Sequence, residues 1–303
     1  MAQETEQQDS NVIDAPLEEP KPPFAKQHQE TPGLESRLDP KPRYQAERYK
    51  AAGKLDRLAA VITGGDSGIG RAVAVLFARE GADVAIGYLP EEQSDALETK
   101  AAVEGAGRRC VLMPGDLRDP GYCSDLVAEA AREFGRLDVL VSNAAYQARK
   151  ALEELTDEEL VKTFETNFYA YVRLTRAALQ HMKPGASIIV TSSETGILGS
   201  KELPDYSATK GAINAFTKTK SMQLVDRQIR INAIAPGPVW TPLNPSDSGA
   251  DEEKASRFGA NSPMKRPAQP EELAPAYVFL ASNADSSYIT GIVLEVMGGE
   301  TTG

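Results

Sequence analysis

The stretch VITGGDSGIG, residues 61–70, decides the fold that this chain is expected to adopt. It ends the apolar run LAAVITG and opens a segment with helical periodicity. Its glycines Gly64, Gly68 and Gly70 permit a tight turn, and the start of a helix offers free N–H groups to a pyrophosphate. A plain strand-to-helix connection is the alternative interpretation. The position at the head of a βαβ unit favours the dinucleotide interpretation.

Short apolar runs alternate with helical stretches along the rest of the chain. The runs are LAAVITG, ADVAIGY, RRCVLM, LDVLVSN, ASIIVTS, IRINAIA and GIVLEV, and the helical stretches are residues 70–80, 90–104, 119–134, 157–182, 206–226 and 270–282. Runs that are apolar on both faces are typical of a covered parallel sheet. We therefore predict an α/β fold over residues 53–303: a single Rossmann-like doubly wound domain, with a seven-stranded parallel sheet and helices on both faces.

Two segments depart from this alternation. Residues 1–52 are rich in Pro, Gln, Glu and Lys and lack an apolar period, so we predict an extended, partly disordered N-terminal tail. It is either a solvated extension or an arm that docks through apolar residues in its second half, and we expect docking there. Residues 236–267 form a long irregular stretch, which we interpret as a lid that shapes the pocket through Trp240, Leu243 and Phe258.

Composition excludes several classes of protein. The net charge of -11 disfavours nucleic acid and anionic membranes as partners, because phosphates would be repelled. Cys110 and Cys123 are too few for a disulfide framework. The N-terminus lacks the basic start of a secretory signal, and no run of about eighteen apolar residues occurs. These features fit a cytoplasmic protein.

The spacing of several motifs resembles that of the short-chain dehydrogenase/reductase family, over residues 55–300. The motifs are TGxxxGxG after the first strand, Asp116 in PGDL, SNAA at residues 142–145, Asn167 in TNFYA, Ser193 in VTSSETG, Tyr206 and Lys210 in YSATK, and PGPVWT at residues 236–241. The tail, with KQHQETPGLES, also resembles a subgroup of general stress proteins and sugar- or aldehyde-acting reductases. Ala145 and Met297 depart from the family pattern.

This resemblance implies an NAD(P)-dependent oxidoreductase. The reaction would be a reversible hydride transfer between the nicotinamide and an alcohol or carbonyl substrate, which is a sugar, a polyol, an aldehyde or a ketone. No metal is expected, since tyrosine, serine and lysine polarise the substrate. The family also implies a homotetramer that pairs the helices at 157–182 and 206–226. A non-catalytic redox sensor, with the tail as a partner-binding arm, is the alternative, and a methyltransferase is a distant third.

Four residues are the expected catalytic set. Tyr206 and Lys210 are four positions apart on a predicted helix and share one face. The lysine and the positive ring of the oxidised cofactor are expected to lower the phenol pKa from about 10, so that Tyr206 acts as general acid and base. Ser193 is expected to bond the substrate oxygen, with Ser192 as its competitor. By resemblance, Asn167 holds a water that links Lys210 to solvent. Taken singly, each residue also fits an ordinary structural role.

The resemblance also assigns the residues that bind the cofactor. They are Thr63, Gly64, Asp66, Ser67, Gly68, Ile69, Gly70, Tyr88, Asp116, Leu117, Asn143, Ala144, Tyr206, Lys210, Pro236, Gly237, Val239 and Thr241. Asp116 would bond the adenine amino group, although a helix cap is an alternative for it. Lys210 would bond the nicotinamide ribose, and Thr241 the carboxamide and pyrophosphate end.

The sequence favours NAD over NADP. Tyr88 and Leu89, at the end of the second strand, carry no charge. Ser67 stands where many NADP-preferring members of the family have arginine. NADP stays open because Arg71, Lys100 or Lys54 could reach the 2′-phosphate.

Overall fold

Seven parallel strands form the centre of the computed structural model, which describes residues 18–249 and 251–301. The strands are β1 (Ala59–Thr63), β2 (Asp83–Tyr88), β3 (Cys110–Pro114), β4 (Val139–Ser142), β5 (Ser187–Thr191), β6 (Arg230–Pro236) and β7 (Val293–Val296). Their order in the sheet is β3-β2-β1-β4-β5-β6-β7. The order reverses between β1 and β4, and ligands of doubly wound sheets bind at such a switch point. The predicted fold is confirmed.

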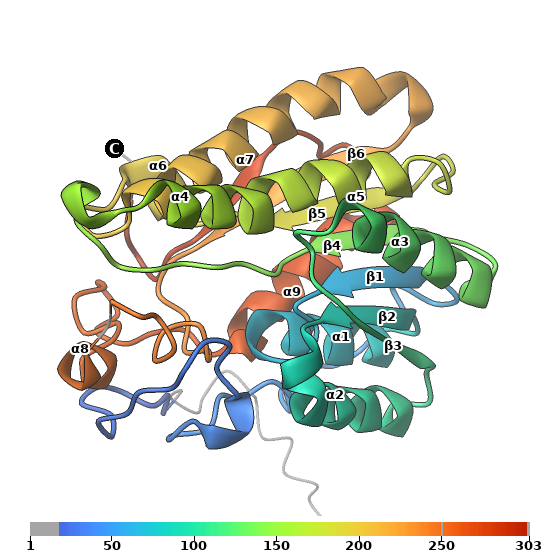
Figure 1. Cartoon of the computed structure of the whole chain (residues 1–303). Coiled ribbons are helices and arrows are strands. Elements are labelled where there is room, and N and C mark those ends of the chain that lie inside the picture. Colours follow the sequence, from blue (N-terminus) through green and yellow to red (C-terminus); the bar gives the residue numbers. More distant parts are fainter. Residues whose placement is uncertain (1–17, 250, 302–303) are drawn as a thin grey trace, which may run out of the picture.

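Helices cover both faces of the sheet (Figure 1). One face carries α1 (Gly68–Arg79), α2 (Gln93–Gly105) and α9 (Pro270–Ala281), and the other carries α3 (Pro120–Phe134), α4 (Asp157–Phe164), α5 (Ala170–Ala178) and α7 (Pro204–Leu224). Three short helices, α6 (Thr195–Leu198), α8 (Glu252–Ser256) and α10 (Asn283–Ser286), lie in the connections. The six predicted helical stretches all appear, and the short helices have no counterpart in the prediction.

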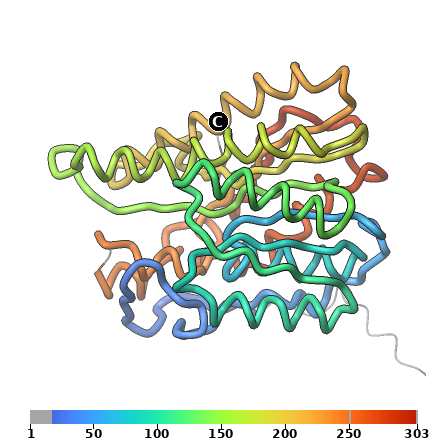
Figure 2. Tube along the Cα trace, turned by 45° about the vertical axis from the view of Figure 1, so that its right-hand side comes forward, coloured from blue at the N-terminus to red at the C-terminus, as the bar shows by residue number. Residues whose placement is uncertain are grey.

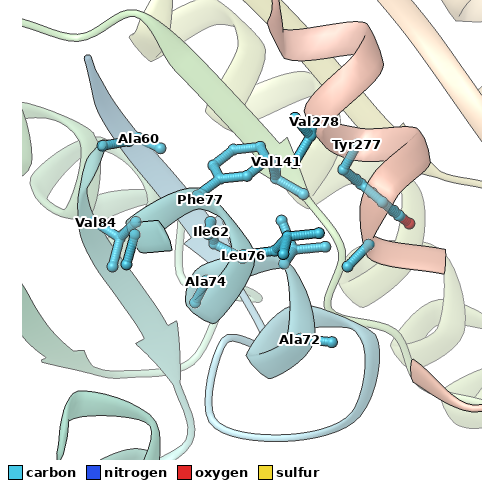
Figure 3. Packing of buried hydrophobic residues seen from close by; sticks show 14 of the residues in the cluster. Ala60, Ile62, Ala72, Ala74, Leu76, Phe77, Val84, Val141, Tyr277 and Val278 are labelled. Atoms are coloured by element: carbon cyan, nitrogen blue, oxygen red, sulfur yellow. The ribbon is translucent and has the colours of Figure 1, made fainter. Parts of the chain in front are cut away.

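The core explains why the strands are continuous apolar runs. All five residues of β1 are buried, because helices cover the sheet on both sides. Figure 3 shows one side, where Phe77 and Leu76 of α1 lie among Ile62 of β1 and Tyr277 and Val278 of α9. The side chains of α3, α5 and α7 form the second apolar layer on the opposite face.

The predicted helix 157–182 is interrupted. Thr156 caps α4 by accepting from the Glu159 N–H at 3.2 Å, and the Glu159 carboxylate accepts from the Thr156 N–H in return. Residues Glu165–Tyr169 then form a π-helical turn, after which α5 continues to Ala178. Such wide turns are frequent at functional sites. Asn167 lies within this turn.

The N-terminal segment contacts the predicted lid, and the expectation that Trp240 of the lid shapes the pocket is wrong. Trp240 is fully buried and does not line the cavity described below. The centre of its ring lies 4.5 Å from the ring centre of Phe24 and 6.3 Å from that of Phe258. Its indole N–H donates to the Pro40 carbonyl oxygen at 2.7 Å. Trp240 is therefore an anchor for the tail, because an indole finds both apolar surface and an acceptor there.

The N-terminal segment lies along the body of the protein from residue 18 onward. In Figures 1 and 2 it runs beside the segment that contains α8, and the Phe24 N–H donates to the Ser256 carbonyl oxygen at 2.8 Å. Tyr44 and Tyr49 pack against the apolar layer of α1. The expectation of disorder falls largely on residues 1–17, outside the described residues. Within the described part of the chain, no helix is long and apolar enough to cross a membrane.

Candidate active site

A cavity of about 450 Å³ opens at the carboxyl ends of the strands. Its walls include most of the residues that the sequence assigned to a site: Gly64, Asp66, Ser67, Gly68, Ile69, Tyr88, Asp116, Leu117, Asn143, Ala144, Ser193, Tyr206, Lys210, Pro236, Gly237, Val239 and Thr241. Three assigned residues, Thr63, Gly70 and Asn167, are not among the lining residues. Residues from almost the whole length of the domain thus meet in one place.

The glycine turn has a shape that side chains would destroy. Gly64 and Gly68 have φ values of 62° and 51°, which favour glycine. A Cβ on Gly70 would lie 1.9 Å from the Gly64 carbonyl oxygen, and one on Gly68 would lie 2.9 Å from the Thr241 side chain. The backbone can therefore approach a ligand closely at the start of α1. This turn fits the pyrophosphate of a dinucleotide.

Thr63 supports the turn through hydrogen bonds, and Gly70 through its close contact with the Gly64 carbonyl group. The Thr63 hydroxyl accepts from the N–H groups of Asn143 and Ala144, at 3.0 and 3.2 Å. The Asn143 amide donates in turn to the Thr63 carbonyl oxygen at 3.2 Å. These bonds join the end of β1 to the end of β4, so the two strands at the switch point hold the turn in place.

Tyr206 and Lys210 lie side by side on α7, both buried. The Lys210 Nζ atom is 5.2 Å from the centre of the Tyr206 ring and donates to the Thr191 carbonyl oxygen at 2.7 Å. Burial raises the pKa of Tyr206 to about 12, partly offset by a hydrogen bond with Ser193, and burial lowers the pKa of Lys210 to about 7. The phenol pKa is thus above its usual value here, because burial outweighs the lowering by Ser193 and by the charge of Arg149. The expectation that the pKa of Tyr206 is lowered also requires the positive ring of the bound cofactor, and it stays a prediction.

The two serines after β5 have different partners. The Ser192 hydroxyl donates to Asn214 Oδ1 on α7 at 2.6 Å. The Ser193 hydroxyl accepts from the Thr195 N–H and hydroxyl, both at 3.1 Å, and it lies near enough to Tyr206 to lower the pKa of the phenol. Ser192 is therefore engaged in holding α7, whereas Ser193 lies beside the phenol.

Asn167 is buried in its π-helical turn, with its side chain fully engaged. Its Oδ1 atom accepts from the Tyr146 N–H at 2.8 Å. Its Nδ2 atom donates to the Tyr146 carbonyl oxygen at 2.9 Å and to the Thr209 hydroxyl at 3.2 Å. The side chain thus ties the segment after β4 to α7, next to the tyrosine and lysine.

Asp116 lies in the cavity wall after β3. Its carboxylate forms an ion pair with Arg118 at 2.6 Å, which holds the pKa of Asp116 below its usual value. The cap of α3 is Asp119, which accepts from the Gly121 N–H at 2.8 Å. The helix-cap alternative for Asp116 is therefore excluded.

The three cations considered for a 2′-phosphate lie outside the cavity. Lys54 pairs with Asp285 at 3.0 Å, and Lys100 pairs with Glu104 at 3.7 Å. Arg71 is buried behind the glycine turn, where its Nε atom donates to the Asp66 carbonyl oxygen at 2.8 Å. The cationic side chains that do line the cavity are Arg118, Arg149, Lys162 and Lys210, and none of them follows β1 or β2.

Carboxylates line the cavity after β1 and β2 instead. They are Asp66, Glu91 and Glu92. Burial, together with the charge of nearby carboxylates, raises the pKa of Asp66 to about 6 and that of Glu92 to about 8. Tyr88, at the end of β2, donates its hydroxyl to Gln93 Oε1 at 2.7 Å. The environment at this end of the cavity is acidic.

Sequence reasoning missed several parts of the wall, among them Glu194, Gln147, Arg149 and a piece of the tail. Glu194 lines the cavity directly after Ser193, and burial raises its pKa to about 7. Its position beside the serine motif is a signal that could have found it. Thr31, Pro32 and Gly33 of the tail also line the cavity. The irregular tail carries no period that would point to this contact.

Comparisons with known proteins point to one family. A family model described as enoyl-(acyl carrier protein) reductase matches residues 64–301. General stress protein 39 of Bacillus subtilis is 49% identical over 88% of this chain and 93% of its own length. NADPH-dependent aldehyde reductase 1, chloroplastic, of Arabidopsis thaliana is 46% identical over 90% of this chain and 96% of its own length.

A solved structure shares the fold. A short chain dehydrogenase from Burkholderia cenocepacia J2315 in complex with NADP is 29% identical with a TM-score of 0.75, over 81% of this chain and 98% of that one. Because the family model and these relatives extend over most of the sequence, the chain belongs to the short-chain dehydrogenase/reductase family and is an oxidoreductase that uses NAD or NADP.

Proposed function

We propose that this oxidoreductase interconverts an alcohol and a carbonyl compound, with Tyr206 as the general acid and base. The observation that carries the proposal is that Ser193, Tyr206 and Lys210 line one cavity together, with the Lys210 amine 5.2 Å from the centre of the Tyr206 ring. When bound, the nicotinamide supplies or accepts the hydride. The protein must then move one proton at the substrate oxygen, and these side chains are placed to do so.

Each side chain has a distinct task in this proposal. In the direction of reduction, Tyr206 gives its proton to the carbonyl oxygen, and Ser193 donates a hydrogen bond to the same oxygen as negative charge develops there. Lys210, whose burial favours the neutral amine, regains positive charge from solvent and stabilises the phenolate that remains. Because the Asn167 side chain is fully engaged, we assign the water of the proton path to the backbone of its π-helical turn.

The substrate is proposed to be a sugar, a polyol, an aldehyde or a ketone. Support comes from a mixed wall, in which Gln147, Arg149 and Glu194 offer polar groups and Leu203 and Phe258 offer apolar surface. The relative from Arabidopsis thaliana is named as an aldehyde reductase. The cofactor-binding residues assigned from the sequence would hold the dinucleotide along the ends of β1 to β6. Thr63 and Gly70 would have a supporting role.

We further propose that NAD is preferred over NADP. The support is that the cavity wall after β1 and β2 carries the acidic residues Asp66 and Glu91, and that none of the cationic lining residues stands there to pair with a 2′-phosphate. Titration of protein fluorescence with NADH and NADPH measures the preference directly. Tighter binding of NADPH, the cofactor named for one relative, would contradict it.

The test of the reaction compares the parent chain with Tyr206→Phe on a panel of aldehydes, ketones, sugars and polyols with both cofactors. We expect turnover by the parent and a loss of at least about a hundredfold in kcat for the variant, with unchanged cofactor binding. Equal rates would disprove the role of Tyr206. The sensor alternative requires tight cofactor binding without any turnover, and it is less well supported because the described tail is bound to its own domain.

The assembly is proposed to be a cytoplasmic homotetramer built on α4, α5 and α7. Its support is the set of exposed apolar side chains on these helices and the turns beside them: Val161, Tyr169, Met222 and Val225 are 52%, 44%, 73% and 57% exposed. Covering them would remove apolar surface from water. Light scattering during gel filtration tests this, and a monomeric mass would overturn it.

A further inference from the structure

Glu35 of the N-terminal segment reaches the glycine turn of the domain. The Glu35 carboxylate accepts from the Gly68 N–H at 2.5 Å and pairs with Arg71 Nη1 at 2.9 Å. The Glu35 N–H donates to the Asp95 carboxylate of α2 at 2.5 Å. Glu35 is only 3% exposed. A residue that lies outside the predicted domain is therefore buried at the centre of the dinucleotide-binding turn.

The contact with Gly68 supplies a cap that α1 lacks. Gly68 is the first residue of α1, and the Ser67 side chain at the N-cap position makes no capping hydrogen bond. The first N–H groups of a helix have no partner within the helix. A carboxylate satisfies one of them and interacts favourably with the helix dipole. Glu35 thus fixes the end of α1 from which the pyrophosphate would be held.

The contact with Arg71 joins the turn to α2. Arg71 Nε donates to the Asp66 carbonyl oxygen at 2.8 Å and to the Thr99 hydroxyl at 3.0 Å. Its Nη2 atom donates to the Asp95 carbonyl oxygen at 2.9 Å. A buried guanidinium needs a buried counter-charge. Three carboxylates lie near it. Glu35 Oε1 is the nearest at 2.9 Å, the half-exposed Glu98 is at 3.1 Å, and the buried Asp95 is at 3.9 Å.

The residues before Glu35 hold the first part of the lid. We name residues 29–35 the strap. The Gln29 N–H donates to the Pro245 carbonyl oxygen at 2.9 Å, and the Thr31 hydroxyl donates to the Ser246 carbonyl oxygen at 2.6 Å. A Cβ on Gly33 would lie 2.9 Å from Ser246 Cβ, so the two chains are in close contact. The strap therefore connects the lid to the glycine turn, and its residues Thr31, Pro32 and Gly33 line the cavity.

We propose that Glu35 is a positioning residue for the dinucleotide, and that the strap is a wall of the cofactor site. Glu35 does not line the cavity, so it acts through Gly68 and Arg71. This inference rests on the proposed function. Burial raises the pKa of Glu35 to about 7, because the charged carboxylate is less stable away from water. A role in supporting the glycine turn explains why a carboxyl group is buried at this place.

The test measures cofactor binding in three variants of the full chain. Glu35→Ala removes the cap and the nearest of the carboxylates that pair with Arg71. Glu35→Gln keeps an acceptor for the Gly68 N–H but loses the charge. Glu30→Gln changes an exposed glutamate in the same strap and is the matched control. NADH fluorescence titration gives Kd, and steady-state kinetics separate KM for the cofactor from kcat.

We expect Glu35→Ala to raise the Kd for NADH about ten- to a hundredfold, the worth of a hydrogen bond to a charged group. Glu35→Gln should give a smaller increase and Glu30→Gln none. In both Glu35 variants kcat at saturating cofactor should stay within about twofold of the parent, because the proton-transfer residues are untouched. A purely structural role would instead lower kcat and the melting temperature together.

The outcomes separate this inference from the proposed function. If the parent binds neither NADH nor NADPH, both are overturned. If the parent binds and turns over substrate while Glu35→Ala and Glu35→Gln bind NADH as the parent does, only the role of Glu35 is overturned. If Glu35→Ala does not fold, Glu35→Gln decides: raised Kd with unchanged kcat supports positioning, and equal loss of kcat and melting temperature contradicts it.

Discussion

The Lys210 amine lies 5.2 Å from the centre of the Tyr206 ring and gives its hydrogen bond to the Thr191 carbonyl oxygen. The pair is therefore prearranged by β5 as well as by α7. Burial acts on the two groups in opposite directions, since it raises the pKa of the phenol and lowers that of the amine. Burial therefore favours the neutral phenol and the neutral amine over their charged forms.

The pH dependence of the two reaction directions should differ. Alcohol oxidation requires the phenolate, and burial raises the pKa of Tyr206 to about 12, so kcat/KM for oxidation should rise with pH from 7 to 10. Reduction requires the phenol and should stay flat over the same range. Rates on one alcohol and its carbonyl product measure both profiles. A fall in oxidation rate with rising pH would contradict the assignment.

Lys210→Met should separate activity from stability. We expect at least about a hundredfold loss of kcat, because the phenolate loses its cation. Burial lowers the pKa of Lys210 to about 7 in the folded chain, whereas a lysine in the unfolded chain has a pKa of about 10. Between pH 7 and about 10, Lys210 is therefore protonated in the unfolded chain and neutral in the folded chain. The stability of the parent relative to the variant should therefore increase from pH 7 to 10. Urea unfolding at several pH values measures it, and a constant difference would contradict it.

The serine pair provides a matched comparison. Ser193→Ala removes the hydroxyl beside Tyr206, so kcat should fall about a hundredfold with little change in stability. Ser192→Ala removes the bond to Asn214, so it should cost about 1 kcal/mol of unfolding free energy and leave kcat within about threefold. Kinetics and thermal unfolding of both variants check this. The reverse result would make Ser192 the substrate-binding residue.

A methyl group at Gly70 should close the glycine turn. Its Cβ would meet the Gly64 carbonyl oxygen, so Gly70→Ala should destabilise the chain by about 1–3 kcal/mol and abolish dinucleotide binding. The control is Gly105→Ala at the end of α2, where nothing lies within 4 Å and a gain of up to about 1 kcal/mol is expected. Isothermal titration with NADH and thermal unfolding test the pair. Normal binding by Gly70→Ala would refute the turn as the phosphate site.

The strands and the reactive helix could be predicted because their signals are local. Continuous apolar runs mark strands that are covered on both faces, and Tyr206 and Lys210 follow helical spacing within one element. Trp240 was misplaced because its partner Phe24 is far away in an irregular segment without periodicity. The engagement of Arg71 was equally hidden, since Glu35 reaches it from outside the repeating pattern. Contacts of this kind depend on tertiary packing alone.

The wide turn at Glu165–Tyr169 also sets the rotational phase of the two helices that it joins. Each residue added to or removed from a helix rotates everything beyond it by about 100°. The wide turn absorbs this rotation because it holds one residue more than a regular turn, so deleting one residue here would give a regular helix in which α5 keeps its face toward α7 and α3. A one-residue deletion in this turn would therefore change the direction of the side chains within it, Asn167 among them, and leave the packing of α5 in place, which no substitution within either helix could do.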